Sequence, residues 1–424
     1  MKKLTLVIGS TVLLAFLAGC GKPSKVEDKP TPEIAATVKV RLPVAGDRFE
    51  VRSDGGWIFQ LHRADSSEEW FETDSYFQIG RGKQFLWLKE NGQKDFDSNV
   101  VWALMRPKKE NQFIKFDGRT YRGEFWVTLD SFANIILVNR LGLEDYIKGV
   151  LPPEIGKRPA KEKEVLKAQA VAARTYTLSH LGQYPGKPWD MESDSRDQVY
   201  SGMEAEDPVC SQAVEETAGE AATFGGKFIN AYYHSTCGGK TDYISSIWPH
   251  KPQESYLVPA DDDTFCLWSK NFYWREGLSQ LWLADKISAF LKQHGRPNLD
   301  KISPITDLAV TERNSSGRVR VLKVQTESEN YSLVADSIRW ALGRPSSPSP
   351  QAILPSTLFD VETFRSRAET LDSAVITGRG AGHGVGMCQT GAIGRARAGH
   401  SYKEILEHYY PGIRLERVRR FGSR

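Results

Sequence analysis

One carboxyl group in this chain of 424 residues stands out because of its neighbours. Glu154 follows two consecutive prolines and precedes Ile155, just ahead of an alanine-rich segment. The prolines predict an extended turn, and apolar neighbours that exclude water raise the pKa of a carboxyl group. A carboxyl group with a raised pKa can act as a general acid near neutral pH. The alternative is a structural carboxylate that caps the next helix or pairs with Arg174.

Two further segments carry polar and aromatic side chains that suit sugars. Gln198 and Tyr200 lie close together in the first segment, and His234 and Ser235 are adjacent in the second. Groups that donate and accept hydrogen bonds suit sugar hydroxyls, and aromatic rings suit sugar faces. Both segments are therefore candidate substrate-binding sites.

A third segment, residues 378–392, is rich in glycine and contains His383 and Gln389. Glycines allow the backbone to turn sharply and to approach a ligand closely. The segment lacks the Lys-Ser/Thr ending of a Walker motif and the glycine spacing of a dinucleotide site, so we do not expect a phosphate-binding loop. His234 and His383 are equally consistent with structural hydrogen bonding, and neither is assigned as a base.

Cysteines give a choice between a disulfide, free thiols and a metal site. Cys210, Cys237, Cys266 and Cys388 lie well beyond the N-terminus, and disulfides persist in exported proteins. Cys237 and Cys266 are the expected bridge because they flank one continuous segment. Unpaired thiols are an alternative, and so is structural zinc held by His234, Cys237 and Cys266. No other metal or cofactor is expected.

The N-terminus has the pattern of a lipoprotein signal peptide. Two lysines precede an apolar run from Leu4 to Leu17, and the order Leu-Ala-Gly leads into Cys20. The run is short for a membrane-spanning helix, and small residues before a cysteine are typical of cleavage and lipid attachment. We expect residues 1–20 to be the signal peptide, Cys20 the lipidation site and residues 21–36 a flexible tether. The alternative is an ordinary secretion signal that contains a cysteine.

These features predict an extracytoplasmic protein held at a membrane by its lipid, in the periplasm or elsewhere in the cell envelope. Composition adds little, because 26% charged residues and a net charge of +3 are ordinary for a globular protein. The sequence has no stripe of basic residues of the kind that indicates nucleic-acid binding. The cationic cluster at residues 414–424 is interpreted as a solvated end.

The elements that would position these residues predict an α+β fold. Short alternating segments in residues 37–115 indicate a small β-rich module. A larger mixed domain, residues 116–424, would combine antiparallel sheets with a few helices. The hydrophobic pattern predicts its helices and strands at the following positions: helices Glu162–His180, Leu278–His294 and Tyr402–Tyr409, and strands Ile305–Val310 and Val319–Thr326.

Six motifs in one order resemble those of the SpoIID family, which includes sporulation proteins and amidase enhancers. The resemblance covers about Tyr121 to Leu415 and is carried by Asn139–Glu154, Ala168–Tyr176, Asp194–Gly202, Tyr233–Thr241, Leu354–Phe359 and Gly380–Gly412. It implies a lytic transglycosylase that acts on peptidoglycan glycan strands, with Glu154 as both acid and base. The alternative is a noncatalytic peptidoglycan-binding protein that stimulates an N-acetylmuramoyl-L-alanine amidase.

The resemblance also implies a substrate-binding set, in a groove between Glu154 and residues 380–391. Arg174 and Gln198 would orient Glu154 and the sugar, and three aspartates remain candidate helpers: Asp194, Asp197 and Asp242. The sequence departs from the usual family pattern at Cys237 and Cys388, where serine is common. The expected substrate-binding residues are Arg174, Gln198, Tyr200, His234, Ser235, His383 and Gln389.

Overall fold

The computed structural model describes residues 37–91, 94–109, 111–262, 264–367 and 370–418. The predicted signal peptide, the lipidation site at Cys20 and the predicted tether lie outside these residues and stay predictions. Among the described residues, no helix is long and apolar enough to cross a membrane.

The fold is α+β, as predicted, and its largest element is a twisted sheet of twelve strands among the described residues. Strand β3 (Trp57–Arg63) pairs with β4 (Glu68–Thr73) on one side and with β7 (Lys94–Pro107) on the other. The remaining strands follow the order β12 (Met191–Glu192), β1 (Thr37–Leu42), β11 (Ile135–Gly142), β10 (Glu124–Leu129), β7 (Lys94–Pro107), β6 (Leu86–Glu90), β5 (Phe77–Arg81), β2 (Arg48–Ser53), β8 (Ile114–Phe116) and β9 (Arg119–Tyr121).

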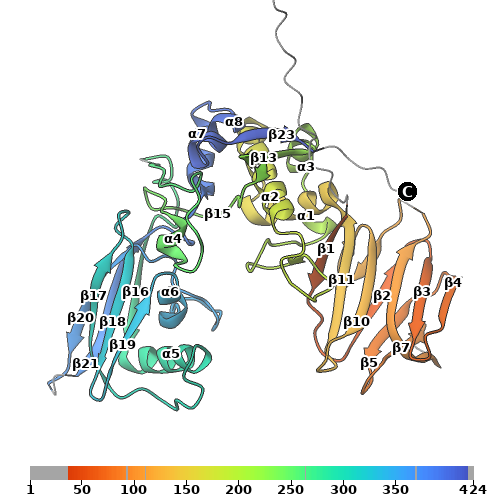
Figure 1. The fold of residues 1–424 in the computed structure, drawn as a ribbon, viewed down its shortest axis with the longest axis horizontal. Helices are drawn as coiled ribbons and strands as arrows, with labels where there is room; N and C mark the ends of the chain where they lie inside the picture. Colours follow the sequence, from red (N-terminus) through yellow and green to blue (C-terminus); the bar gives the residue numbers. More distant parts are fainter. Residues whose placement is uncertain (1–36, 92–93, 110, 263, 368–369, 419–424) are drawn as a thin grey trace, which may run out of the picture.

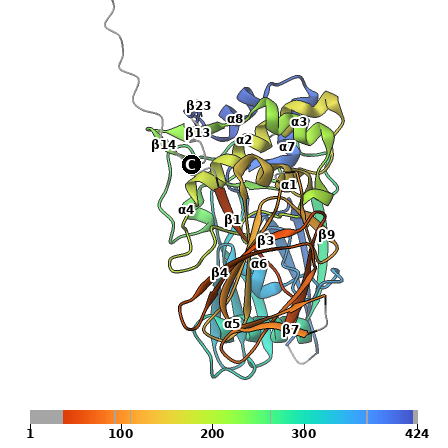
Figure 2. The same ribbon diagram turned by 90° about the vertical axis from the view of Figure 1, so that its right-hand side faces the viewer.

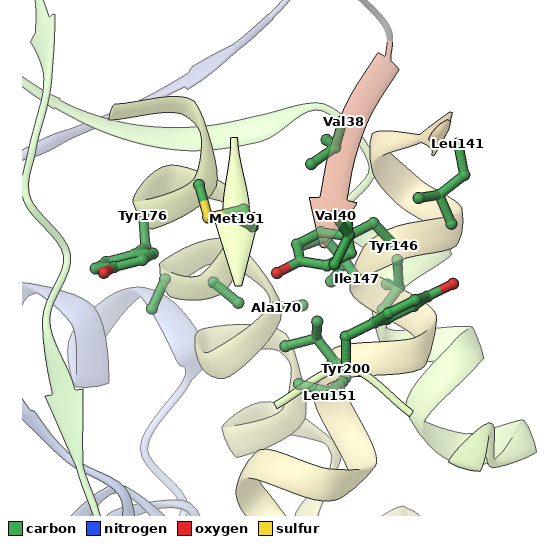
Figure 3. Packing of buried hydrophobic residues seen from close by; sticks show 14 of the residues in the cluster. Val38, Val40, Leu141, Tyr146, Ile147, Leu151, Ala170, Tyr176, Met191 and Tyr200 are labelled. Atoms are coloured by element: carbon green, nitrogen blue, oxygen red, sulfur yellow. The ribbon is translucent and has the colours of Figure 1, made fainter. Parts of the chain in front are cut away.

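Strand β1 joins the N-terminal strands to the rest of the chain. It pairs antiparallel with β11 and parallel with β12, so the sheet holds residues from both sides of the predicted boundary between 115 and 116. Apolar residues alternate along β1, and Val38 and Val40 are buried because successive strand residues face opposite sides of a sheet. Figure 3 shows Val40 and Met191 sharing a core with Ile147 of the first helix. The boundary itself stays a prediction.

Helices α1, α3, α7 and α8 pack around α2 in one helical layer, and α1 lies beside the end of β1 and β11 (Figure 1; Figure 2). The predicted alanine-rich helix is confirmed as α2, and its small side chains let neighbouring helices approach closely. Next to this layer lies a three-stranded sheet of β13 (Glu220–Phe224), β14 (Lys227–Phe228) and β23 (Arg414–Arg417). The five helices are α1 (Leu143–Ile155), α2 (Lys163–Ser179), α3 (Pro208–Glu216), α7 (Gln389–Arg397) and α8 (Tyr402–Tyr409).

The extended turn predicted at the two prolines is wrong, because Pro152 and Pro153 lie in the last turn of α1. A proline inside a helix leaves one carbonyl without its usual amide donor. The carbonyl of Gly149, four residues before Pro153, instead accepts the amide of Ser201 at 3.4 Å. Tertiary contact therefore compensates for the proline, and Glu154 projects from the helix end.

A second lobe is inserted into this domain and has its own hydrophobic core (Figure 1). It interrupts the chain between β15 (Tyr233–His234) and β22 (Met387–Cys388), which pair in parallel. The short helix α4 (Ile244–Ile247) precedes it. The lobe contains two three-stranded antiparallel sheets, β16 (Tyr273–Ser279), β21 (Leu371–Arg379) and β20 (Phe359–Arg365), then β17 (Ile305–Arg313), β18 (Val319–Thr326) and β19 (Asn330–Val334), with helices α5 (Gln280–Gln293) and α6 (Ser337–Leu342).

The predicted helices at α5 and α8 and the predicted strands at β17 and β18 are confirmed. The insertion itself was not predicted. Its two ends meet at β15 and β22, so the lobe leaves and rejoins the domain at one place.

A substitution at Gly149 tests the packing of α1 against Tyr200. A Cβ atom at Gly149 would lie 2.5 Å from the ring of Tyr200. We expect Gly149→Ala to lower the free energy of unfolding by about 1 to 2 kcal/mol, because overpacking outweighs the gain in helix propensity. Gly277→Ala is the control, since an added Cβ there meets open space. Urea denaturation measures both variants, and a Gly149→Ala protein as stable as the control would contradict this packing.

Candidate functional site

Glu154 lies at the end of α1 with its carboxyl group half-buried. Its Oε1 accepts the backbone amide of Val199 at 2.6 Å. Burial raises the pKa of Glu154 from 4.5 to about 7, although the Val199 amide and the Gln389 side chain act in the opposite direction. The carboxyl group is therefore poised to hold or release a proton near neutral pH.

Gln389, the first residue of α7, joins the glycine-rich segment to Glu154. Its Nε2 donates to the Glu154 backbone carbonyl at 3.1 Å and lies 3.4 Å from Oε1 of Gln169. Gln389, one residue of the segment 380–391, thus lies beside Glu154. The proposed groove between them stays a prediction.

Gln198 is fully buried, and its contacts are with other protein groups. Its Oε1 accepts the hydroxyls of Tyr146 at 3.2 Å and Thr177 at 2.9 Å. Its Nε2 donates to the Ala173 carbonyl at 3.2 Å and to the Tyr233 hydroxyl at 3.0 Å. These four bonds fix the backbone immediately before the Val199 amide. Both ends of the Gln198 side-chain amide thus bind protein groups, and its orienting role stays a prediction.

Tyr200 packs against two other tyrosines and is buried. Its ring centroid lies 6.1 Å from that of Tyr121 and 5.2 Å from that of Tyr146. Its hydroxyl donates to Oδ1 of Asn139 at 2.9 Å. In this arrangement Tyr200 supports the loop beneath Glu154 and presents no free face to a sugar.

Arg174 is fully buried on α2 and bonds to Glu144, not to Glu154. Its Nε and Nη2 donate to the two carboxylate oxygens of Glu144 at 2.9 and 2.7 Å. Nη1 also donates to the Glu220 carbonyl at 2.9 Å. Such a two-pronged pair ties helices together. Of the expected orienting and sugar-binding roles, this structure supports neither for Arg174.

His234 is buried and neutral, because burial holds its pKa well below the usual value, with His383 and Arg318 adding to the effect. Its Nδ1 lies 3.1 Å from the Val385 carbonyl, and Nε2 has no partner among the described residues. Ser235 next to it is half-buried, and its Oγ lies 3.4 Å from the Thr236 hydroxyl.

His383 links the glycine-rich segment to β15. Its Nε2 lies 3.0 Å from the Tyr233 carbonyl, and its Nδ1 accepts the Val385 amide at 3.1 Å. This pattern requires the proton on Nε2. Burial lowers the pKa of His383 to about 4, so the ring is neutral at pH 7. His383 thus uses both ring nitrogens within the protein, while Nε2 of His234 is buried without a partner among the described residues.

All three candidate helper aspartates have partners within the protein. Asp197 accepts the Tyr184 hydroxyl at 2.8 Å and the Glu192 amide at 2.7 Å. Asp242 accepts the Ser316 hydroxyl at 2.5 Å, and Asp194 pairs with Arg196 at 2.7 Å.

The four cysteines of the described residues are free thiols. The sulfur atoms of Cys237 and Cys266 lie 3.5 Å apart, whereas a disulfide bond is about 2.05 Å long. The predicted disulfide is therefore absent from this structure. Of the alternative zinc set, Cys237 and Cys266 lie together, and the potential ligands beside them among the described residues are Asp262 and Cys388, not His234.

Three groups at the site escaped the sequence analysis. The Val199 amide carries no side-chain signal, and Asp262 lies in no recognised motif. Tyr233 is partly buried and lies close enough to Glu154 for the carboxylate to raise the pKa of its phenol, although desolvation raises that pKa more. Its place directly before His234 is the one signal that could have identified it.

A cavity of about 460 Å³ lies away from Glu154, at the end of the large sheet. Charged side chains of both signs line it, among them Arg41, Asp47, Glu192 and Arg196. Arg41 and Glu192 already pair at 3.3 Å. The residues lining this cavity do not include the predicted catalytic or substrate-binding set.

Two sequence families match separate parts of the chain. The family described as stage II sporulation protein, SpoIID, matches residues 132–224, which contain Glu154, α2 and Val199. A domain of unknown function matches residues 256–386, which contain the inserted lobe. The second match contains the whole core of the inserted lobe, together with residues of the larger core such as Tyr256 and Val385.

Relatives extend the match over about two thirds of the chain. An uncharacterized protein of Brachyspira hyodysenteriae is 34% identical over 66% of this chain and 68% of its own length. Stage II sporulation protein D of Bacillus subtilis is 26% identical over 67% of this chain and 77% of its own length. The amidase enhancer of Bacillus subtilis is 29% identical over 63% of this chain, but this match spans only 40% of that relative.

The raised pKa of Glu154 predicts a pH-dependent difference in stability between the protein and Glu154→Gln. Between pH 4.5 and about 7 the unfolded chain loses this proton while the folded protein keeps it. The native protein therefore loses stability relative to the variant over this window, on the order of 3 kcal/mol in total. Urea denaturation at several pH values measures the difference, and a constant difference would contradict the raised pKa.

Proposed function

The chain belongs to the SpoIID family, and on that premise we propose that it cleaves peptidoglycan glycan strands as a lytic transglycosylase. One observation carries the proposal. Glu154, inside the segment that matches the family, is a half-buried carboxyl group whose pKa is raised to about 7 and which accepts a backbone amide. One group able to give and take a proton at neutral pH suits this reaction.

In the proposed reaction Glu154 first acts as an acid. It protonates the glycosidic oxygen beside a muramic acid residue, and the bond from that oxygen to C1 breaks. The carboxylate that results is stabilised by the Val199 amide, which already lies 2.6 Å from Oε1. Hydrogen bonds to the charged form favour it, and this one limits the cost of ionising a buried group.

Glu154 then acts as a base. The C6 hydroxyl of the same muramic acid attacks C1, and its proton passes to the Glu154 carboxylate. The products are a 1,6-anhydro sugar end and a free hydroxyl on the departing sugar. The proton lost in the first step is regained, so no water is consumed and no second carboxylate is needed. A paired-carboxylate hydrolase would require such a partner.

Neighbouring groups support this role by position. Gln198 fixes the loop that carries the Val199 amide, and Gln389 binds the Glu154 backbone. Ser235, with its half-buried hydroxyl, offers a polar contact for a sugar, whereas Nε2 of His234 is buried. The proposed location is outside the cytoplasm, with lipid on Cys20 as the membrane anchor.

A second candidate function is stimulation of a cell-wall amidase without cleavage of glycan. The observation that favours it is the 29% identity with the amidase enhancer of Bacillus subtilis. In that case the site would bind peptidoglycan, and Glu154 would contribute a hydrogen bond in place of a proton.

Glu154→Gln separates catalysis from binding. The amide cannot release a proton, so we expect at least a 100-fold loss of glycan cleavage with the fold and glycan binding retained. Glu215→Gln is the matched control, because Glu215 is an exposed acid on α3. Intact peptidoglycan and peptide-stripped glycan serve as substrates, and mass spectrometry counts 1,6-anhydromuramic ends.

The control should release such ends at the native rate. Turnover by Glu154→Gln would exclude Glu154 as the acid. If the native protein gives no anhydro ends but increases the rate of an added amidase, the second candidate function replaces the first.

A further inference from the structure

We propose that Cys237, Asp262, Cys266 and Cys388 bind one structural zinc ion. All four residues are buried, and their ligand atoms lie within 4.8 Å of one another. Three thiolates and one carboxylate form a donor set that suits zinc in a closed, four-coordinate site. This inference is independent of the proposed reaction, since it concerns how the fold is held together.

Two distances between ligand atoms are close to those of a tetrahedral zinc site. Zinc binds sulfur at about 2.3 Å, which places two sulfur ligands about 3.8 Å apart in a tetrahedron. The sulfur atoms of Cys237 and Cys266 lie 3.5 Å apart. Oδ2 of Asp262 lies 3.2 Å from the Cys237 sulfur, where a tetrahedron requires about 3.5 Å.

Backbone amides already point at the sulfur atoms. The Cys388 sulfur accepts the amide of Cys237 at 3.2 Å and the amide of Gly391 at 3.3 Å. The Cys237 sulfur accepts the amide of Gly239 at 3.3 Å. Such outer contacts orient thiolate ligands and offset part of their negative charge.

Asp262 is oriented so that one oxygen is available to the ion. Its Oδ1 accepts the Tyr409 hydroxyl at 2.5 Å and lies 3.4 Å from Nε of Arg395. Its Oδ2 faces the Cys237 sulfur. The Arg395 guanidinium offsets part of the charge of three thiolates and a carboxylate. A Cβ at Gly391 would lie 1.9 Å from Oδ2, so only glycine lets α7 approach this carboxylate so closely.

The site would join segments that are far apart in the sequence. Cys237 follows β15, Asp262 and Cys266 precede the inserted lobe, and Cys388 ends β22. Gln389, which binds the backbone of Glu154, is the next residue after Cys388. Zinc would therefore link the two ends of the insertion to each other and hold the start of α7 against α1. Because all four positions are filled by protein, the ion would have no open position for catalysis.

Metal analysis of the complete chain, purified in detergent without chelators, tests the proposal. Inductively coupled plasma mass spectrometry should find about one zinc ion per chain. Cys210→Ser is the matched control, because Cys210 is also a buried free thiol but lies on α3 outside the cluster. The control should keep its zinc, and Cys266→Ser and Asp262→Asn should bind zinc about 10- to 100-fold more weakly.

Cobalt gives a second measurement that does not depend on the variants folding. Replacing zinc by Co²⁺ in the native chain should produce a thiolate charge-transfer band and the intense visible bands of a tetrahedral site. Native protein with neither metal content nor cobalt bands would overturn the proposal. A Cys237–Cys266 disulfide found by peptide mass spectrometry in the unreduced native chain would also overturn it.

Discussion

The hydrogen bond from the Val199 amide to Glu154 is the interaction that the rest of the site supports. Burial disfavours the charged carboxylate, and the amide favours it by offering a fixed donor at 2.6 Å. Their competition sets the pKa near 7, so the carboxyl group is available in both protonation states at neutral pH. Without burial the group would stay ionised, and without the amide it would ionise with difficulty. A residue that must give a proton and take one back needs both conditions.

The two sides of this hydrogen bond are held by different parts of the fold. Gln198, inside the helical layer, fixes the loop that carries the amide, and Gln389 at the start of α7 binds the backbone of Glu154. The inserted lobe begins and ends beside β15 and β22, directly next to Gln389, and it folds around a separate core. Its own sheets can therefore differ in detail while the helix ends that position Glu154 keep their places.

Local sequence patterns were sufficient to predict the regular elements and to single out Glu154. They did not predict which groups the polar side chains contact. Alanine spacing predicted α2, and the two prolines drew attention to Glu154. The same prolines led to a wrong prediction of the backbone conformation. The Gly149 carbonyl, which Pro153 leaves without its usual donor, accepts the amide of Ser201, a residue far away in the sequence. Arg174 and Gln198 are polar residues in expected motifs, yet both bind groups inside the protein. Side-chain type does not reveal which partner the fold brings near, and a backbone amide such as that of Val199 leaves no trace in the sequence.

The central claim is that one carboxyl group is kept poorly hydrated and close to neutral pKa. A direct measurement is a carbon-13 NMR titration of the chain labelled at glutamate side-chain carboxyls, with Glu154→Gln used to assign the signal. The account predicts that the Glu154 signal titrates with a pKa of about 7. A midpoint near the ordinary value of 4.5 would show a hydrated carboxylate and would contradict the account.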